Sequence, residues 1–141
     1  MRSNYKERSD WFSLDMTRKS PKILIIEDEK ILAEMYRDKF NQAGFKTEVA
    51  FTAEEGLRFL KKKKADLILL DILLPRENGI QFLKRIQKYP KISRIPVVAF
   101  SNYDDPRAKN EAFNLGIKEY LIKTAYTSKE IIKKIRNILV S

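Results

Sequence analysis

Histidine and cysteine are both absent from the 141 residues of this chain. Without cysteine the protein has no disulfide, no thiolate metal ligand and no thiol nucleophile, a composition that suits a reducing compartment. Without histidine it has neither a Ser-His-Asp triad nor a His-ligated zinc site, since both need an imidazole. The chain therefore cannot carry a phosphohistidine of its own.

Long apolar runs and nucleotide-binding loops are also missing. No run of about 18 apolar residues is present and the N-terminus lacks the apolar core of a secretion signal, so we expect a soluble cytoplasmic protein without membrane insertion. The patterns GxxxxGK[ST] and GxGxxG are absent as well. We therefore do not expect this chain to hold a nucleotide in a loop of either kind.

Positive charge is what the chain has in excess, with 29 Lys and Arg against 19 Asp and Glu and a net charge of +10. A surplus of this size is typical of proteins that contact nucleic acid, acidic proteins or anionic surfaces. Here the basic residues fall on several predicted helices, at 61–64, 84–91 and 129–136, which is more typical of solvated helix faces. Nucleic-acid binding is therefore the less favoured interpretation.

From Lys22 onward, short apolar runs alternate with segments of helical spacing. The predicted strands are Ile23–Ile26, Phe45–Ala50, Leu67–Leu70, Val97–Phe100 and Tyr120–Ile122. Their nearly continuous apolar character indicates a parallel sheet covered by helices on both faces, an α/β fold of the doubly wound kind. We predict one domain over residues 21–141 after a flexible tail, residues 1–20. Two interpretations of the tail are open: translation starts at Met16, or Trp11, Phe12 and Leu14 form a docking motif. The first is favoured.

The segments between the strands carry helix signals. The first helix is predicted to place five apolar residues on one face: Leu32, Met35, Tyr36, Phe40 and Ala43. Two later helices begin with the capping-box spacing, at Thr52 with Glu55 and at Thr127 with Glu130. A further helix begins at Asp105.

Polar residues stand where four of the predicted strands end: Glu27 and Asp28, Asp71, Ser101, and Lys123. Each alone is explained by a strand end or a surface charge. Ligands of parallel sheets, however, collect at the carboxyl ends of the strands, beside the point where the strand order reverses. Together these side chains indicate one site.

In a sheet of order 2-1-3-4-5, Asp28 and Asp71 would face each other. Three clustered carboxylates repel, and a hard cation relieves this; Mg²⁺ prefers oxygen ligands and keeps several waters. We predict Mg²⁺ on Asp28, Asp71 and one backbone carbonyl, with Glu27 acting through water. A carboxylate beside Mg²⁺ and the Lys123 ammonium is placed to attack phosphorus, so Asp71 is the predicted nucleophile. Ser101 would then donate its hydroxyl to the bound phosphoryl group.

The segments ILIIEDE, ADLILLDILLP, VVAFS and EYLIK resemble the signature segments of response-regulator receiver domains, over residues 21–140. The resemblance implies a flavodoxin-like fold and a two-component phosphorelay, with a histidine kinase or a histidine phosphotransfer protein as partner. It implies these site roles: the acidic pair Glu27 and Asp28, the phosphoacceptor Asp71, the metal-binding backbone carbonyl of Leu73, the switch residues Ser101 and Tyr120, and the lysine Lys123.

The resemblance also implies how such a domain acts. Phosphorylation would reshape the face made by the helix that begins at Asp105, the strand Tyr120–Ile122 and the last helix, to which a downstream protein binds. Because the last helix ends at the C-terminus, we expect a stand-alone receiver, similar to a chemotaxis regulator, without an output domain. On that face Phe113 is either exposed near Tyr103 or partly covered. No enzymatic activity is expected beyond self-phosphorylation and slow autodephosphorylation.

Two departures from the family pattern concern the site. Thr124 stands where receivers have a proline, usually after a cis bond. A cis bond without proline costs about 2.5–4 kcal/mol, so we expect a strained loop or a trans bond with shifted geometry. Leu73 and Tyr103 should hinder water from reaching the acyl phosphate, which predicts slow hydrolysis. A phosphorylation-independent interaction module and a basic nucleic-acid binder are the alternative functions.

Overall fold

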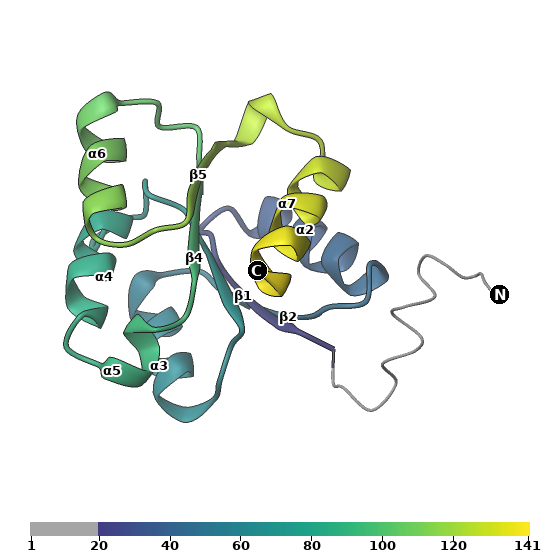
Figure 1. Ribbon diagram of the computed structural model, residues 1–141, viewed down its shortest axis with the longest axis horizontal. Helices are drawn as coiled ribbons and strands as arrows, with labels where there is room; N and C mark the ends of the chain where they lie inside the picture. Colours follow the sequence, from purple (N-terminus) through teal and green to yellow (C-terminus); the bar gives the residue numbers. More distant parts are fainter. Residues whose placement is uncertain (1–19) are drawn as a thin grey trace, which may run out of the picture.

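A computed structural model of the chain describes residues 20–141 and shows one five-stranded parallel sheet between two layers of helices (Figure 1). The order along the sheet is β2-β1-β3-β4-β5, as predicted. The strands have these bounds: β1 (Lys22–Ile26), β2 (Lys46–Ala50), β3 (Leu67–Leu70), β4 (Val97–Ser101) and β5 (Glu119–Ile122). Each predicted strand therefore lies within one residue of an observed one at either end.

Helices cover both faces of this sheet, with α2 and α7 on one side and α3, α4, α5 and α6 on the other (Figure 1). Their bounds are α2 (Lys30–Gln42), α3 (Ala53–Lys62), α4 (Gly79–Ile86), α5 (Pro90–Ser93), α6 (Pro106–Asn114) and α7 (Ser128–Val140), with a 3₁₀ turn, η1, at Lys123–Ala125. The short helix α5 was not predicted. It opens at Pro90, so Lys91 lies on α5 and not on the helix that carries Lys84.

Two apolar cores result from the alternation of side chains along the strands. On β1, Leu24 and Ile26 join the core under α3, α4 and α6, while Ile23 and Ile25 join the core under α2 and α7. Because β1, β3 and β4 are buried on both faces, their sequences are apolar without interruption. Burying each such side chain contributes about 1.5–3 kcal/mol, so the central strands fix the fold.

One prediction for α2 is wrong. Ala33, Tyr36 and Phe40 form its buried stripe, whereas Met35 is 38% exposed. Successive residues of an α-helix are rotated by about 100°, so the residue before Tyr36 points away from the sheet. The helical spacing of apolar residues therefore did not show whether Met35 or its neighbour Tyr36 is buried.

Side-chain caps fix where several helices begin. Thr127 and Glu130 form the predicted capping box of α7. At α3, Thr52 accepts from the Glu55 amide as predicted, but the Glu55 carboxylate accepts from the Phe51 amide and not from Thr52 itself. The helix α4 has a capping box that was not predicted, between Asn78 and Gln81. Asp105 caps α6, as predicted.

The predicted tail, with its docking motif and alternative start, lies outside the described residues except for Ser20. Within residues 20–141, no helix has both the length and the apolar character needed to cross a membrane.

Candidate metal centre

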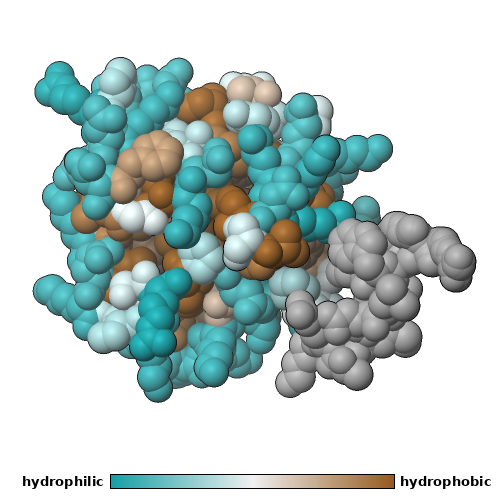
Figure 2. Space-filling view, viewed as in Figure 1, coloured by the Kyte–Doolittle hydropathy of each residue, from teal (hydrophilic) through white to brown (hydrophobic). Residues whose placement is uncertain are grey.

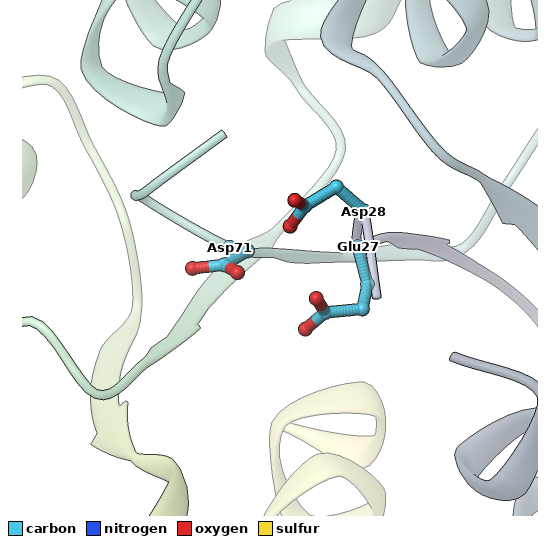
Figure 3. A group of neighbouring side chains, drawn as sticks. All are labelled: Glu27, Asp28 and Asp71. Atoms are coloured by element: carbon cyan, nitrogen blue, oxygen red, sulfur yellow. The ribbon is translucent and has the colours of Figure 1, made fainter. Parts of the chain in front are cut away.

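Three carboxylates meet at the carboxyl ends of the two central strands β1 and β3. Oxygen atoms of Glu27, Asp28 and Asp71 all lie within 4.8 Å of one another, and Figure 3 shows the three side chains around a common space. Backbone hydrogen bonds continue the sheet past the strand ends, from the Glu27 amide to Ala50 (3.0 Å) and from the Asp71 amide to Ile26 (3.0 Å). The fold thus places all three carboxylates, as predicted.

Lys123 brings an ammonium group to this cluster from the end of β5. Its Nζ atom donates to Asp71 Oδ2 at 3.0 Å and to Glu27 Oε1, and its side chain is only 10% exposed. Burial acts to lower the pKa of Lys123, but the hydrogen bonds and negative charges of Glu27 and Asp71 outweigh it and raise this pKa. The lysine therefore stays protonated.

The ammonium does not balance the charge of the cluster, because three carboxylates face one cation. Burial raises the pKa of Glu27 above its ordinary value, and the nearby charge of Asp71 adds to the rise, although Lys123 opposes it. Several hard oxygen ligands with an excess negative charge are what Mg²⁺ prefers in proteins. The residues present therefore fit a divalent cation.

The backbone after Asp71 is held close to the cluster. The Leu73 amide donates to Asp71 Oδ1 at 3.1 Å, and the Gly79 amide donates to the Ile72 carbonyl at 2.9 Å. A Cβ atom at Gly79 would lie 2.7 Å from the Asp71 carbonyl oxygen and 2.8 Å from Ile72 Cα, closer than such contacts occur. A glycine is therefore required where α4 begins, a role that the sequence did not reveal.

Ser101 and Tyr120 lie on neighbouring strands and are linked through Tyr103. The buried Ser101 hydroxyl oxygen accepts from the Tyr103 amide at 3.2 Å, and the Tyr120 hydroxyl donates to the Tyr103 carbonyl. Burial raises the pKa of Tyr120 to about 12, so its hydroxyl keeps its proton for this bond. Tyr103 therefore joins the two predicted switch residues, a connection that the sequence analysis missed.

The peptide bond after Lys123 is trans, since no cis bond occurs among residues 20–141. The Thr124 amide, which a proline would lack, donates to Asn102 Oδ1 at 3.2 Å. Asn102 directly follows Ser101, so this hydrogen bond ties the β4–α6 loop to the turn that carries Lys123. No sequence signal pointed to Asn102, because its partner is 22 residues away.

Exposed apolar side chains lie on the loops that follow Asp71 and Ser101 and on α6. Leu73 is 54% exposed and Tyr103 is 39% exposed, and both line a groove between the loop after β3 and α6. Phe113 on α6 is 48% exposed, which decides the alternative left open for this residue in favour of a solvent-facing side chain.

Comparison with known proteins agrees with this geometry. The sequence profile of the response regulator receiver domain matches residues 23–136. This chain belongs to that family. It is therefore a receiver domain of the two-component response regulators, and the predicted fold class is confirmed.

Several curated relatives of this receiver domain are transcriptional regulators. DltR of Streptococcus agalactiae is 29% identical over 115 residues, which are 82% of this chain and 50% of DltR. The phosphate regulon regulator PhoB of Escherichia coli is 30% identical over 118 residues, 84% of this chain and 51% of PhoB. The chain thus spans about half the length of the curated relatives that it matches.

Solved receiver structures match nearly the whole described region. The receiver domain of the Francisella response regulator 1452 superposes with a TM-score of 0.76 at 32% identity, covering 85% of this chain and 96% of that one. The chemotaxis protein CheY4 of Vibrio cholerae superposes with a TM-score of 0.79 at 22% identity, covering 84% and 98%. The second likeness concerns the fold alone.

Proposed function

We propose that this receiver domain accepts a phosphoryl group on Asp71 and passes the signal to a protein that binds the face formed by α6, β5 and α7. The observation that carries the proposal is the contact between the buried Asp71 carboxylate and Lys123 Nζ, 3.0 Å apart, within a cluster of three carboxylates. A carboxylate in such a site is both poised to attack phosphorus and surrounded by groups that compensate the charge of the incoming group.

Asp28, Asp71 and the backbone carbonyl of Leu73 would hold Mg²⁺, and Glu27 would act on it through water. When bound, the metal neutralises negative charge on the phosphoryl oxygens. The Leu73 amide already donates to Asp71 Oδ1, which fixes the loop that carries the proposed carbonyl ligand. Glu27 also positions Lys123, because it accepts a hydrogen bond from the same Nζ atom.

In the transfer step, a carboxylate oxygen of Asp71 forms a bond to phosphorus while the phosphorus–nitrogen bond of a donor phosphohistidine breaks. The bonding electron pair stays on the donor imidazole, which takes up a proton. The chain itself contains no histidine, so the donor is a histidine kinase or a histidine phosphotransfer protein. Lys123 stabilises the charge that develops on the transferring oxygens, and its bond to Asp71 orients it for this.

The switch that follows would begin at Ser101. Its oxygen accepts from the Tyr103 amide, which leaves the hydroxyl proton available for a phosphoryl oxygen on Asp71. A movement of Ser101 toward the phosphoryl group would pull on Tyr103 and hence on Tyr120, whose hydroxyl bonds to the Tyr103 carbonyl. Such a shift would change the populations of two arrangements of the face formed by α6, β5 and α7.

Leu73 and Tyr103 would make the phosphorylated state long-lived, since neither side chain positions a water molecule well for attack on the acyl phosphate. Leu73 and Tyr103 each lie two residues past a site residue, Asp71 or Ser101, and both are exposed in one groove, from which they would cover the phosphoryl group. Apart from self-phosphorylation and this slow hydrolysis, we propose no enzymatic activity, and we place the protein in the cytoplasm.

Intact-protein mass spectrometry after incubation with acetyl phosphate tests the proposal. We expect the mass of one phosphoryl group to be added in the presence of Mg²⁺, and no addition to the Asp71→Asn variant or without Mg²⁺. An Asp38→Asn variant, changed on an exposed side chain of α2, serves as the control and is expected to behave like the wild type. A wild-type protein that stays unmodified with several phosphodonors would favour a phosphorylation-independent interaction module instead.

A further inference from the structure

A basic groove lies at the end of the sheet opposite the carboxylate cluster of Glu27, Asp28 and Asp71. The sequence analysis did not recognise its residues as one surface. It lies where α3 ends and α5 follows α4, and six cationic side chains line it: Lys61, Lys62, Lys63, Lys64, Lys91 and Arg94. All six are exposed, and the buried residues Leu60 and Ile92 line the groove as well. In Figure 2, hydrophilic side chains project over the lower left of the molecule, where α3 and α5 lie in Figure 1.

The groove cations are only weakly compensated within residues 20–141, where Lys61 Nζ lies 5.2 Å from the centroid of the Tyr89 ring. Among residues 20–141, the ion pairs of basic side chains involve Arg37, Lys84, Arg85, Lys109 and Lys123, and none of the six groove cations. The one acidic residue that lines the groove, Asp66, accepts a hydrogen bond from the Lys22 amide at 2.7 Å, and its negative charge offsets only one of the six positive charges. Six like charges at one surface repel one another, and an anionic ligand would relieve this.

The chain itself does not supply that ligand. Residues 1–19 contain five basic and three acidic side chains, and a second copy of the protein carries the same net charge of +10. Both carry net positive charge, so charge complementarity favours a different, anionic molecule as the ligand of the basic groove.

We propose that the basic groove binds the phosphate backbone of nucleic acid. Five of the six cations are lysines, and the compact ammonium group of lysine binds phosphate as a point charge. Consecutive lysines on a short exposed segment can contact successive phosphates without reading the bases. The binding is therefore independent of sequence and strongly dependent on salt.

The basic groove is distant from the proposed phosphorylation site. Lys22 and Asp66, beside the groove, flank the amino ends of β1 and β3, whereas Glu27 and Asp71 follow the carboxyl ends of the same strands. The binding of nucleic acid does not depend on Asp71, so the two proposals can fail separately.

Fluorescence anisotropy with a labelled mixed-sequence 20-base-pair duplex tests the proposal on the full chain. If the six cations each contact a phosphate, the logarithm of the binding constant falls with the logarithm of the salt concentration with a slope of about −5. Replacing Lys61, Lys62, Lys63 and Lys64 with glutamine is expected to reduce that slope to about −2. A control with the same loss of charge replaces four exposed lysines elsewhere: Lys39, Lys46, Lys129 and Lys133.

We expect the control variant to keep the wild-type slope and the Asp71→Asn variant to keep the wild-type affinity. The proposal is overturned if the duplex does not bind at low salt, or if the control loses as much affinity as the groove variant. Tighter binding of an acidic peptide or of phosphatidylserine vesicles than of the duplex at the same salt concentration would also overturn it, and would assign the groove to that partner.

Discussion

The two ends of the sheet carry charges of opposite sign in opposite surroundings. At the carboxyl ends, Glu27, Asp71 and Lys123 are nearly buried, and the lysine bonds to both carboxylates. At the amino ends, the six cations of the basic groove are exposed and lack carboxylate partners within residues 20–141. Water and salt screen the second group, whereas burial strengthens the interactions of the first.

This difference shows where a single side chain matters. A buried charge that loses its partner is left without compensation, which costs several kcal/mol, whereas an exposed ion contributes about 0–1 kcal/mol. We therefore expect individual substitutions to have large effects at the carboxyl ends. At the amino ends we expect a measurable effect only from combined substitutions, and only on the affinity for a charged ligand.

The largest effect is expected for Lys123→Met. The variant removes the ammonium that contacts Asp71, so the phosphorylation rate with acetyl phosphate should fall by about 10²–10³-fold, the usual loss when one charge-stabilising donor is removed. This rate is measured by quenching the reaction at successive times and determining the phosphorylated fraction by intact-protein mass spectrometry. Lys129→Met, at an exposed position of α7, is the matched control; a Lys123→Met rate within tenfold of the wild type would contradict the role given to the lysine.

The next effect concerns Asp28, the exposed member of the carboxylate cluster. If Mg²⁺ binds there, a concentration 100 times its Kd should stabilise the wild type by about 2.7 kcal/mol, and Asp28→Asn should lose most of this gain. In metal-free buffer the variant should melt at a higher temperature than the wild type, because one of three mutually repelling carboxylates is gone. Thermal unfolding with and without Mg²⁺ measures both, with Asp38→Asn as the control.

A smaller effect is expected at Asn102, which accepts the hydrogen bond of the Thr124 amide. Asn102→Ala should lower the free energy of unfolding by about 1 kcal/mol and slow phosphorylation, because the turn that carries Lys123 loses its tether. Urea unfolding and the phosphorylation time course measure these changes. In a Thr124→Pro background, which lacks the amide donor, the same substitution should have no further effect; additive losses would show that Asn102 acts in another way.

The sequence was sufficient to predict the central strands and to predict that the site residues lie close together. Ile68 and Leu69, for example, lie in an uninterrupted apolar run because β3 is covered on both faces, and such runs are recognisable without a structure. Glu27, Asp71 and Lys123 could be placed together because parallel strands end at the same edge of the sheet.

The sequence could not predict contacts between segments that are far apart in the chain and share no repeating pattern of residues. The hydrogen bond between Asn102 and Thr124 joins two loops, and the Gly79 requirement depends on how closely α4 approaches the backbone at Asp71. The basic residues looked scattered because Lys91 and Arg94 are about 30 positions from Lys61–Lys64 in the chain; only the fold brings them to one groove.

The smallest effect is expected when the four lysines at positions 61–64 are replaced with glutamine and stability alone is measured. Each side chain is exposed and forms no ion pair with a carboxylate of residues 20–141, so the free energy of unfolding in urea should stay within about 0.5 kcal/mol of the wild type. Any change should be a gain at low salt, because repulsion between neighbouring ammonium groups is removed, and it should vanish at high salt. A loss of more than about 1 kcal/mol would show that these lysines stabilise the fold, and the contrast between the two ends of the sheet would then fail.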